Sequence, residues 1–118
     1  MKIEEWNAIE KDEETKVIAE DGDICTVIDG VAFLIQRKND WNNIVCIRVE
    51  ESKTSILQTF INFQKWCKEQ KIQFVRVEGI SHRYKMLYLV ARKCECKVIY
   101  DTDESKEYGR HIYYIKVY

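Results

Sequence analysis

Hydrophobic and polar residues alternate at strand spacing through the first half of the chain. Three runs rich in β-branched residues cover residues 24–28, 31–36 and 44–49. Asp29 and Gly30 separate the first two runs, and an Asp-Gly pair in that position is typical of a tight hairpin turn with positive φ at both residues. A shorter run at residues 17–19 predicts one more strand. We therefore expect an antiparallel meander of three or four strands.

Helical spacing predicts one short helix and two longer ones. Apolar residues recur near the N-terminus at Ile3, Trp6 and Ile9, followed by a polar loop over residues 10–15. A broad apolar face over residues 56–67 predicts a long helix, with Ser52 or Thr54 as its N-cap. The other long helix is predicted from apolar residues at i, i+3, i+4 and i+7, namely Tyr84, Leu87, Tyr88 and Ala91.

The second half of the chain predicts three further strands. One covers residues 73–77 and ends at Glu78 and Gly79, and two closing strands at 94–100 and 110–118 are joined by an acidic loop at 101–107. A strand, a helix and a second strand imply a crossover, and hence a parallel or splayed pair.

The last strand is apolar on both faces, so it is either covered on both or forms an interface. Its interface candidates are Tyr113, Tyr114 and Tyr118. The alternative is a strand wedged between the two long helices and the N-terminal helix.

Composition limits the class of protein. The chain has 118 residues, 33% of them charged, and a net charge of −1, which fits a single domain over residues 1–118 and disfavours binding to nucleic acid or an anionic membrane. Apolar residues do not persist for the ~20 positions that a spanning helix needs. Five cysteines, an odd number, are typical of reduced thiols rather than disulfides. We therefore expect a cytoplasmic protein.

Cysteine and histidine also suggest a metal site as an alternative. Cys94 and Cys96 lie two positions apart, and His82 and His111 are the two histidines. Alternate strand residues share a face, but the chain has no second closely spaced pair of ligands, so we interpret the cysteines as structural and expect no metal.

The order of elements over residues 23–118 resembles the GNAT superfamily of acetyl-CoA-dependent N-acyltransferases. Residues 56–72 are similar to the family's helix after the cofactor loop, and within residues 81–96 Leu87 and Tyr88 resemble the Leu-Tyr of its penultimate helix. The resemblance implies a reduced α/β (α+β) domain with a mixed, mostly antiparallel sheet, two principal helices and a short N-terminal helix. Residues 1–22 would supply that helix, a loop and the first strand.

The resemblance also implies acetyl-CoA as cofactor. Pantetheine would pair with the strand at residues 44–49, and backbone N–H groups at the next helix start would hold the pyrophosphate. The matching cofactor residues are Val49, Ser52, Lys53, Thr54 and Ser55. This chain departs from the family here, because the family's loop reads Gln/Arg-x-x-Gly-x-Gly/Ala and residues 49–56 contain no glycine. About 20 residues precede Asp23, where the family usually places two helices.

Catalysis in such an enzyme needs a base for the amine and an acid for the departing thiolate. Tyr88 matches the family's acid if Ser81 replaces the usual asparagine, whereas a register two residues later places Val90 there. Glu78 is the candidate base, with Glu50 behind it.

Three functions follow. The first is a non-catalytic GNAT-fold module that binds another protein or itself through the C-terminal strand, as a small accessory or virus-encoded protein would. The alternative is an acetyl-CoA-dependent N-acyltransferase acting on a primary amine, and a metal or thiol protein is an outlier. The loop at residues 49–56 separates the first two: free N–H groups facing a cleft favour the enzyme, and capped ones disfavour it.

Overall fold

A computed structural model describes residues 1–13, 15–38, 41–79 and 83–118 of the chain. Within these residues there are four helices and six strands. In chain order they are α1 (Ile3–Ala8), β1 (Ile24–Ile28), β2 (Val31–Lys38), β3 (Trp41–Arg48), α2 (Ile56–Glu69), β4 (Phe74–Gly79), α3 (Arg83–Lys93), β5 (Lys97–Tyr100), α4 (Thr102–Tyr108) and β6 (His111–Lys116).

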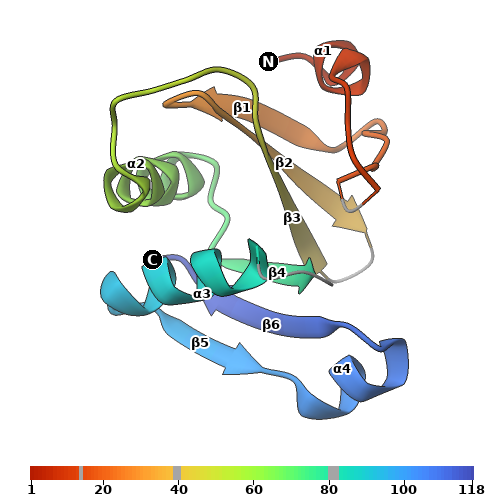
Figure 1. Cartoon of the computed structure of the whole chain (residues 1–118), viewed down its shortest axis with the longest axis vertical. Coiled ribbons are helices and arrows are strands. Elements are labelled where there is room, and N and C mark those ends of the chain that lie inside the picture. Colours follow the sequence, from red (N-terminus) through yellow and green to blue (C-terminus); the bar gives the residue numbers. More distant parts are fainter. Residues whose placement is uncertain (14, 39–40, 80–82) are drawn as a thin grey trace.

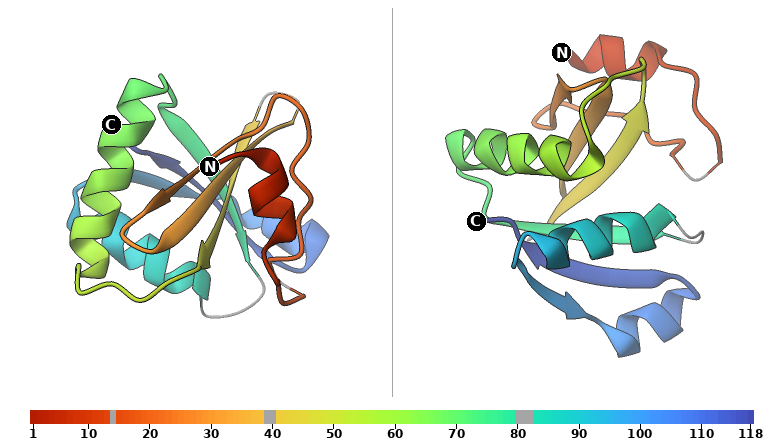
Figure 2. Two further views of the ribbon diagram at one scale, coloured as in Figure 1. Left: turned by 90° about the horizontal axis from the view of Figure 1, so that it is seen from above. Right: turned by 60° about the vertical axis from the view of Figure 1, so that its left-hand side comes forward.

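The strands form one mixed sheet in the order β1-β2-β3-β4-β6-β5 (Figure 1). Neighbouring strands are antiparallel except β3 and β4, which are parallel. Seen from above, α1 and α2 lie on opposite sides of β1 to β3 (Figure 2). The predicted mixed, mostly antiparallel sheet with two principal helices is confirmed.

The hairpin between β1 and β2 has the predicted geometry. Asp29 has φ 50° and Gly30 has φ 79°, which are the two positive values of a type I′ turn. A Cβ on Gly30 would lie 2.3 Å from the carbonyl oxygen of Glu50. The Gly30 carbonyl in turn accepts hydrogen bonds from the N–H groups of Val49 and Glu50. The turn therefore fixes the chain where it leaves β3.

A large hydrophobic core fills the face of the sheet that α2 and α3 cover. Phe60, Phe63 and Cys67 of α2 pack into one cluster with residues from both halves of the sheet, such as Phe33 of β2 and Ile115 of β6. Stacking between Phe33 and Phe63, whose ring centroids are 4.5 Å apart, adds to this contact. Helix α2 thus joins the β1–β3 half to the β4–β6 half.

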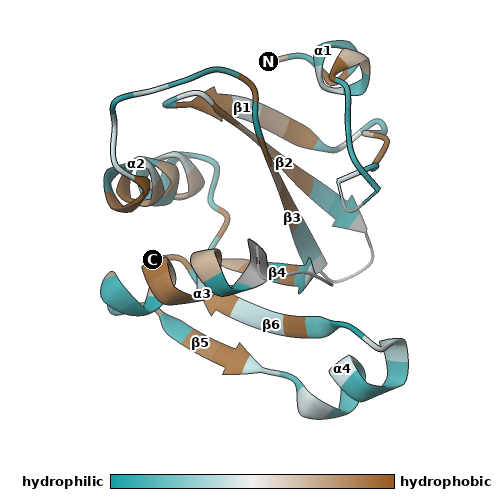
Figure 3. Ribbon diagram, viewed as in Figure 1, coloured by the Kyte–Doolittle hydropathy of each residue, from teal (hydrophilic) through white to brown (hydrophobic). Residues whose placement is uncertain are grey.

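A smaller core lies on the opposite face, under α1. Trp6 is fully buried there against Ala32 and Leu34 of β2. Figure 3 shows hydrophobic residues along much of β2 and β3, which are enclosed between the two cores.

Residues 17–19 are not a strand, contrary to the sequence prediction. Their backbone is bonded by side chains of α1 instead of a neighbouring strand. The indole N–H of Trp6 donates to the Val17 carbonyl at 3.0 Å. The Asn7 amide both accepts from the Ala19 N–H at 2.8 Å and donates to the Ala19 carbonyl at 3.1 Å. These bonds satisfy the groups that strand pairing would have used.

The predicted acidic loop at residues 101–107 is also wrong, because this segment forms α4. Asp101 is its N-cap and accepts from the Glu104 N–H at 2.9 Å, while Asp103 and Glu104 supply negative charge to the first turn. Gly109 ends the helix with φ 63°. The acidic residues were start signals of a short helix rather than signs of a loop.

Strand β6 is an inner strand of the sheet, between β4 and β5. Its Tyr113 and Ile115 belong to the large core, and Ile112 on the other face is also fully buried, next to α4. Strand β6 is therefore covered by the large core on one face and in part by α4 on the other, not by the N-terminal helix that the wedged alternative named.

Candidate functional site

The parallel strands β3 and β4 diverge along their length. Among the described residues, one pair is in register between them, Asn43 with Arg76, whereas β2 and β3 are paired over the whole length of both strands. A cavity of about 380 Å³ is lined by Cys46, Ile47 and Arg48 of β3 together with residues from the 10–15 loop. The cavity therefore lies between this loop and the C-terminal part of β3.

Several backbone N–H groups of the loop that leads from β3 into α2 already donate hydrogen bonds within the protein. The N–H groups of Val49 and Glu50 donate to Gly30, as described above, and the Thr54 N–H donates to the Ser52 hydroxyl at 3.1 Å. The N-cap of α2 is Ser55, rather than the predicted Ser52 or Thr54, and its hydroxyl accepts from the Gln58 N–H at 3.1 Å.

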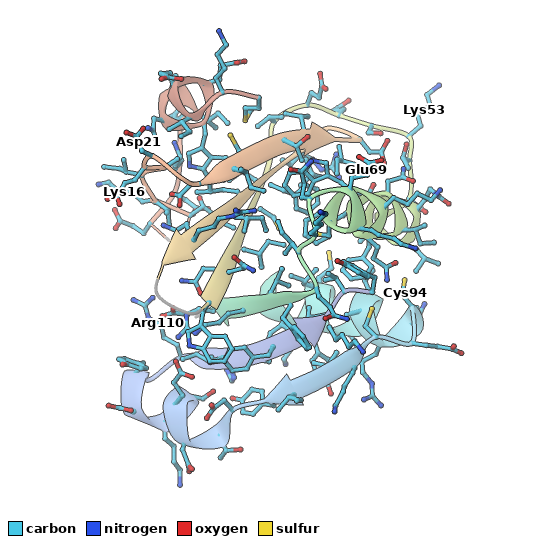
Figure 4. All side chains as sticks on the ribbon, turned by 180° about the vertical axis from the view of Figure 1, so that it is seen from behind. Lys16, Asp21, Lys53, Glu69, Cys94 and Arg110 are labelled. Carbon is cyan, nitrogen blue, oxygen red and sulfur yellow. The ribbon has the colours of Figure 1, made fainter. Side chains whose placement is uncertain are left out.

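Lys53 is exposed, and its side chain points outward from this loop (Figure 4). The loop therefore resembles a capped helix start more than an open cradle for phosphate.

Tyr88 lies on α3, packed against the large core. Its ring meets that of Tyr113 edge to face, with the centroids 5.7 Å apart. Such a contact is the ordinary role of an aromatic residue on the inner face of a helix. Ser81, which the resemblance named, and His82, which the metal alternative named, lie outside the described residues, as does the side chain of Tyr84.

Glu78, the candidate base, is an ion-pair partner of two arginines. Its Oε2 lies 2.8 Å from Nη1 of Arg76 and its Oε1 lies 2.9 Å from Nη1 of Arg110. Arg110 immediately precedes β6, beside the end of β4 (Figure 4). Both carboxylate oxygens of Glu78 are thus engaged by cations, which leaves little access for a substrate amine.

Arg76 is the centre of a polar network on the face of the sheet opposite α3. Besides Glu78, its guanidinium donates to Oε1 of Glu104 at 2.8 Å and to Oδ1 of Asn43 at 3.2 Å. The second oxygen of Glu104 accepts from the Tyr114 hydroxyl at 2.7 Å. The sequence analysis missed this network, because its members come from β3, β4, α4 and β6.

The network shifts the pKa values of Glu104, Tyr114 and Arg76. Hydrogen bonds from Tyr114 and Arg76 lower the pKa of the Glu104 carboxyl. Burial and the hydrogen bond to Glu104 raise the pKa of the Tyr114 phenol. Burial alone would lower the pKa of the Arg76 guanidinium, but its bonds to Glu78 and Glu104 outweigh burial and raise it. The charges of two arginines, Arg76 and Arg110, cancel those of two glutamates, Glu78 and Glu104. This balance is typical of a network that stabilises the fold.

Next to this network, large apolar side chains are exposed on the same face of the sheet. Trp41 at the start of β3 is 49% exposed and tilts against Tyr114 with the ring centroids 4.6 Å apart. Phe74 of β4 is 49% exposed and Ile99 of β5 is 53% exposed. Ile99 is paired with Tyr114, and Phe74 lies two residues before Arg76, so all four side chains share one face. We call Trp41, Phe74, Ile99 and Tyr114 the apolar sheet face.

The three tyrosines predicted as an interface have different positions. Tyr113 is fully buried and therefore has no surface to offer a partner, which corrects the prediction for this residue. Tyr114 is half-buried within the apolar sheet face, and Tyr118 is 41% exposed beyond the end of β6. Trp41 was not predicted as part of this face because the predicted strand began at residue 44, whereas β3 begins at Trp41.

The cysteines are all free thiols. Burial raises the pKa of the Cys67 thiol to about 12, and it also raises the pKa values of Cys94 and Cys96. Cys94 lies just beyond the end of α3 (Figure 4). In the part of the chain that the structure describes, no three His, Cys, Asp or Glu side chains are grouped so that they could hold a metal ion.

Comparisons with models of protein families, with curated proteins and with solved structures found no match. None of the helices in the described ranges has the length and apolar character needed to cross a membrane.

Proposed function

We propose that the chain is a non-catalytic interaction module, built on a reduced GNAT-like scaffold, that binds a protein partner through the apolar sheet face. The observation that supports this function is the exposure of Trp41, Phe74 and Ile99 on the same face of the sheet as Tyr114. Contiguous exposed apolar patches bordered by polar residues mark interaction sites in monomeric proteins. Aromatic side chains are also enriched where proteins bind one another.

The scaffold part of the proposal is supported by the strand arrangement. Three antiparallel strands, a crossover through α2 to a parallel strand, and a final hairpin inserted beside that strand agree with the order that the resemblance implies. Fold does not define function, however, and the residues that the resemblance nominates for catalysis have structural contacts. Tyr88 packs on Tyr113, and Glu78 is paired with two arginines.

The experiment compares the wild-type chain with a Trp41→Ser/Phe74→Ser variant, both immobilised as bait. A partner retained by the wild type and lost by the variant is then purified and its affinity for both is measured. Because both residues are about half exposed, we expect the variant to stay folded, with unchanged circular dichroism, and to bind the partner at least 30-fold more weakly, roughly 2 kcal/mol. A Leu89→Ser variant is the matched control, since Leu89 is 59% exposed on α3, outside the apolar sheet face. Equal binding by all three chains would refute the proposal.

A second candidate function is acetyl-CoA-dependent N-acyl transfer. The observation that favours it is the cavity of about 380 Å³ along β3, the strand nominated for pantetheine. Glu10 and Asp12 line the same cavity and are suited to attract a cationic amine.

Calorimetric titration with CoA and acetyl-CoA tests this candidate. Micromolar binding that is weakened by Lys53→Glu, together with acetylation of an amine that is lost in Tyr88→Phe, would establish the enzyme and overturn the non-catalytic proposal. No heat at millimolar CoA would eliminate the candidate.

A further inference from the structure

Strand β5 is the last strand in the order of the described sheet, so one of its two edges is bonded to β6 and the other faces away from the sheet (Figure 1). The backbone groups on such an edge are a template for pairing with another strand. Three of the four residues of β5 are exposed, including Ile99 and Tyr100.

The alternation of hydrogen-bonded and non-bonded residues between β5 and β6 shows which backbone groups of β5 face the open edge. The Asp101 N–H donates to the Ile112 carbonyl at 2.9 Å, and this pair continues the register of β5 with β6. In antiparallel pairs, bonded and non-bonded residues alternate. Lys97 and Ile99 therefore direct their backbone groups toward β6. Val98 and Tyr100 direct theirs to the open edge.

Two outward-facing residues separated by one position make this edge complementary to itself. If a second copy approaches antiparallel with the two Ile99 residues opposite one another, Val98 of each copy lies opposite Tyr100 of the other. The outward N–H and C=O groups of Val98 and Tyr100 then pair in both directions, as a two-fold symmetric contact requires.

The charges of the segment fit the same register. Lys97 falls opposite Asp101 of the second copy, and the symmetry makes this pairing twice. Oppositely charged residues facing each other across two strands stabilise the pairing, whereas like charges destabilise it. Asp101 is also the N-cap of α4, so the extended segment ends there and pairing is confined to residues 97–101.

This arrangement also covers part of the apolar sheet face. Ile99 would form a non-bonded cross-strand pair with its counterpart, the type of pair in which side chains are closest. The two side chains, each 53% exposed in the single chain, would shield one another next to Tyr114. We infer that a second copy of the chain joins this one edge to edge through β5 into one continuous sheet. Trp41 and Phe74 lie on β3 and β4, outside this contact, so the inference goes beyond the proposed function.

Sedimentation velocity and light scattering on the purified chain, up to about 300 μM, test this inference. We expect the mass to rise with concentration toward twice 14.2 kDa. Ile99→Lys places two like charges opposite each other and should leave only the single-chain mass, with dimerisation weakened at least 100-fold. Leu89→Lys, the same change at an exposed position on α3, should dimerise like the wild type.

Two further variants separate pairing from folding. Val98→Pro removes an outward N–H without removing a bond to β6, so it should abolish the dimer while circular dichroism stays unchanged. Asp101→Asn keeps a capping side chain but loses the charge opposite Lys97, so dimerisation should weaken about tenfold and lose part of its salt dependence. If Val98→Pro fails to fold, the masses of Ile99→Lys and Asp101→Asn test the inference without it.

The inference is overturned if the wild type keeps the single-chain mass at every concentration, or if Ile99→Lys dimerises normally. A wild type that stays single but retains a different protein through Trp41 and Phe74 would overturn self-pairing and leave the proposed function standing. Acetyl transfer that requires Tyr88 would instead overturn the proposed function, whatever the mass of the chain.

Discussion

Arg76 and Glu104 are joined by an ion pair of 2.8 Å that connects the middle of β4 to the first turn of α4. The Arg76 side chain is only 10% exposed, and that of Glu104 is 26% exposed. A buried guanidinium needs its partners, because a charge left unpaired in the interior costs several kcal/mol. Helix α4 is therefore held to the sheet by its acidic first turn.

Glu104→Gln should destabilise the chain by about 1–2 kcal/mol, since a charge-assisted hydrogen bond at a partly exposed site is lost. The pKa of Glu104 is lowered in the folded state, so the unfolded chain binds more protons in acid and stability falls as the pH drops through that folded pKa. Urea unfolding between pH 7 and pH 3 should show a smaller loss in the variant than in the wild type. An equal loss would contradict a role for Glu104 in acid sensitivity.

Asn7→Ala should destabilise the N-terminal segment by about 1–3 kcal/mol. The Asn7 amide makes two hydrogen bonds to the Ala19 backbone, and without it a buried N–H and C=O lose their partners. Asn7→Asp is an informative comparison, because it retains the acceptor and loses the donor. Thermal unfolding monitored by circular dichroism measures both, and a midpoint unchanged in Asn7→Ala would show that water replaces the amide.

Gly30→Ala should be among the most damaging single changes, at about 2–4 kcal/mol. Its φ of 79° is unfavourable for alanine, and the new methyl group would lie 2.3 Å from the Glu50 carbonyl oxygen. Gly109→Ala is the matched control, because φ is 63° there but no atom lies within 4 Å of the added Cβ. Chemical denaturation should give the control a loss of only about 1 kcal/mol. Equal losses would mean that the close approach to Glu50 relaxes at no cost.

Cys67 should be protected from thiol reagents in the folded chain. Its side chain is fully buried and its pKa is raised to about 12 by burial, so almost no thiolate is present at pH 8. Labelling followed by peptide mass spectrometry should modify Cys67 only when denaturant is added, and Cys25 without it.

The raised pKa of Cys67 in the folded chain also means that the thiol of the unfolded chain ionises first, so the stability of the fold should decrease as the pH rises above about 9. Cys67→Ser at the same pH values tests that part of the loss.

Features encoded by neighbouring residues were predictable from the sequence. The turn at Asp29 and Gly30 and the apolar face of α2 depend on positions within a few residues of each other, and both are confirmed. The segment at residues 17–19 has strand-like residues, but its hydrogen-bond partner Asn7 lies 12 positions before Ala19, and this tertiary contact prevails over local preference.

The candidate site was less predictable for the same reason. Arg76 is hydrogen-bonded to Glu104 and Asn43, which lie 28 and 33 residues away along the sequence, and no local pattern indicates such partners. The expected roles of Tyr88 and Glu78 came from their places in the order of elements. Their contacts with Tyr113 and with two arginines depend on packing that only the folded chain defines. Trp41 could have been assigned to a strand by extending the predicted strand three residues toward the N-terminus.

The position of β6 between β4 and β5 has a consequence for synthesis on the ribosome. Strands β4 and β5 both emerge before β6, yet they have no bonds to each other and must wait for the strand that joins them. The β1–β3 meander, by contrast, has all of its antiparallel partners as soon as β3 is made and lacks only the parallel contact with β4. Folding during translation should therefore proceed in two stages. Until residues 111–116 appear, the later half presents exposed strand edges that a chaperone or an aggregating neighbour can bind.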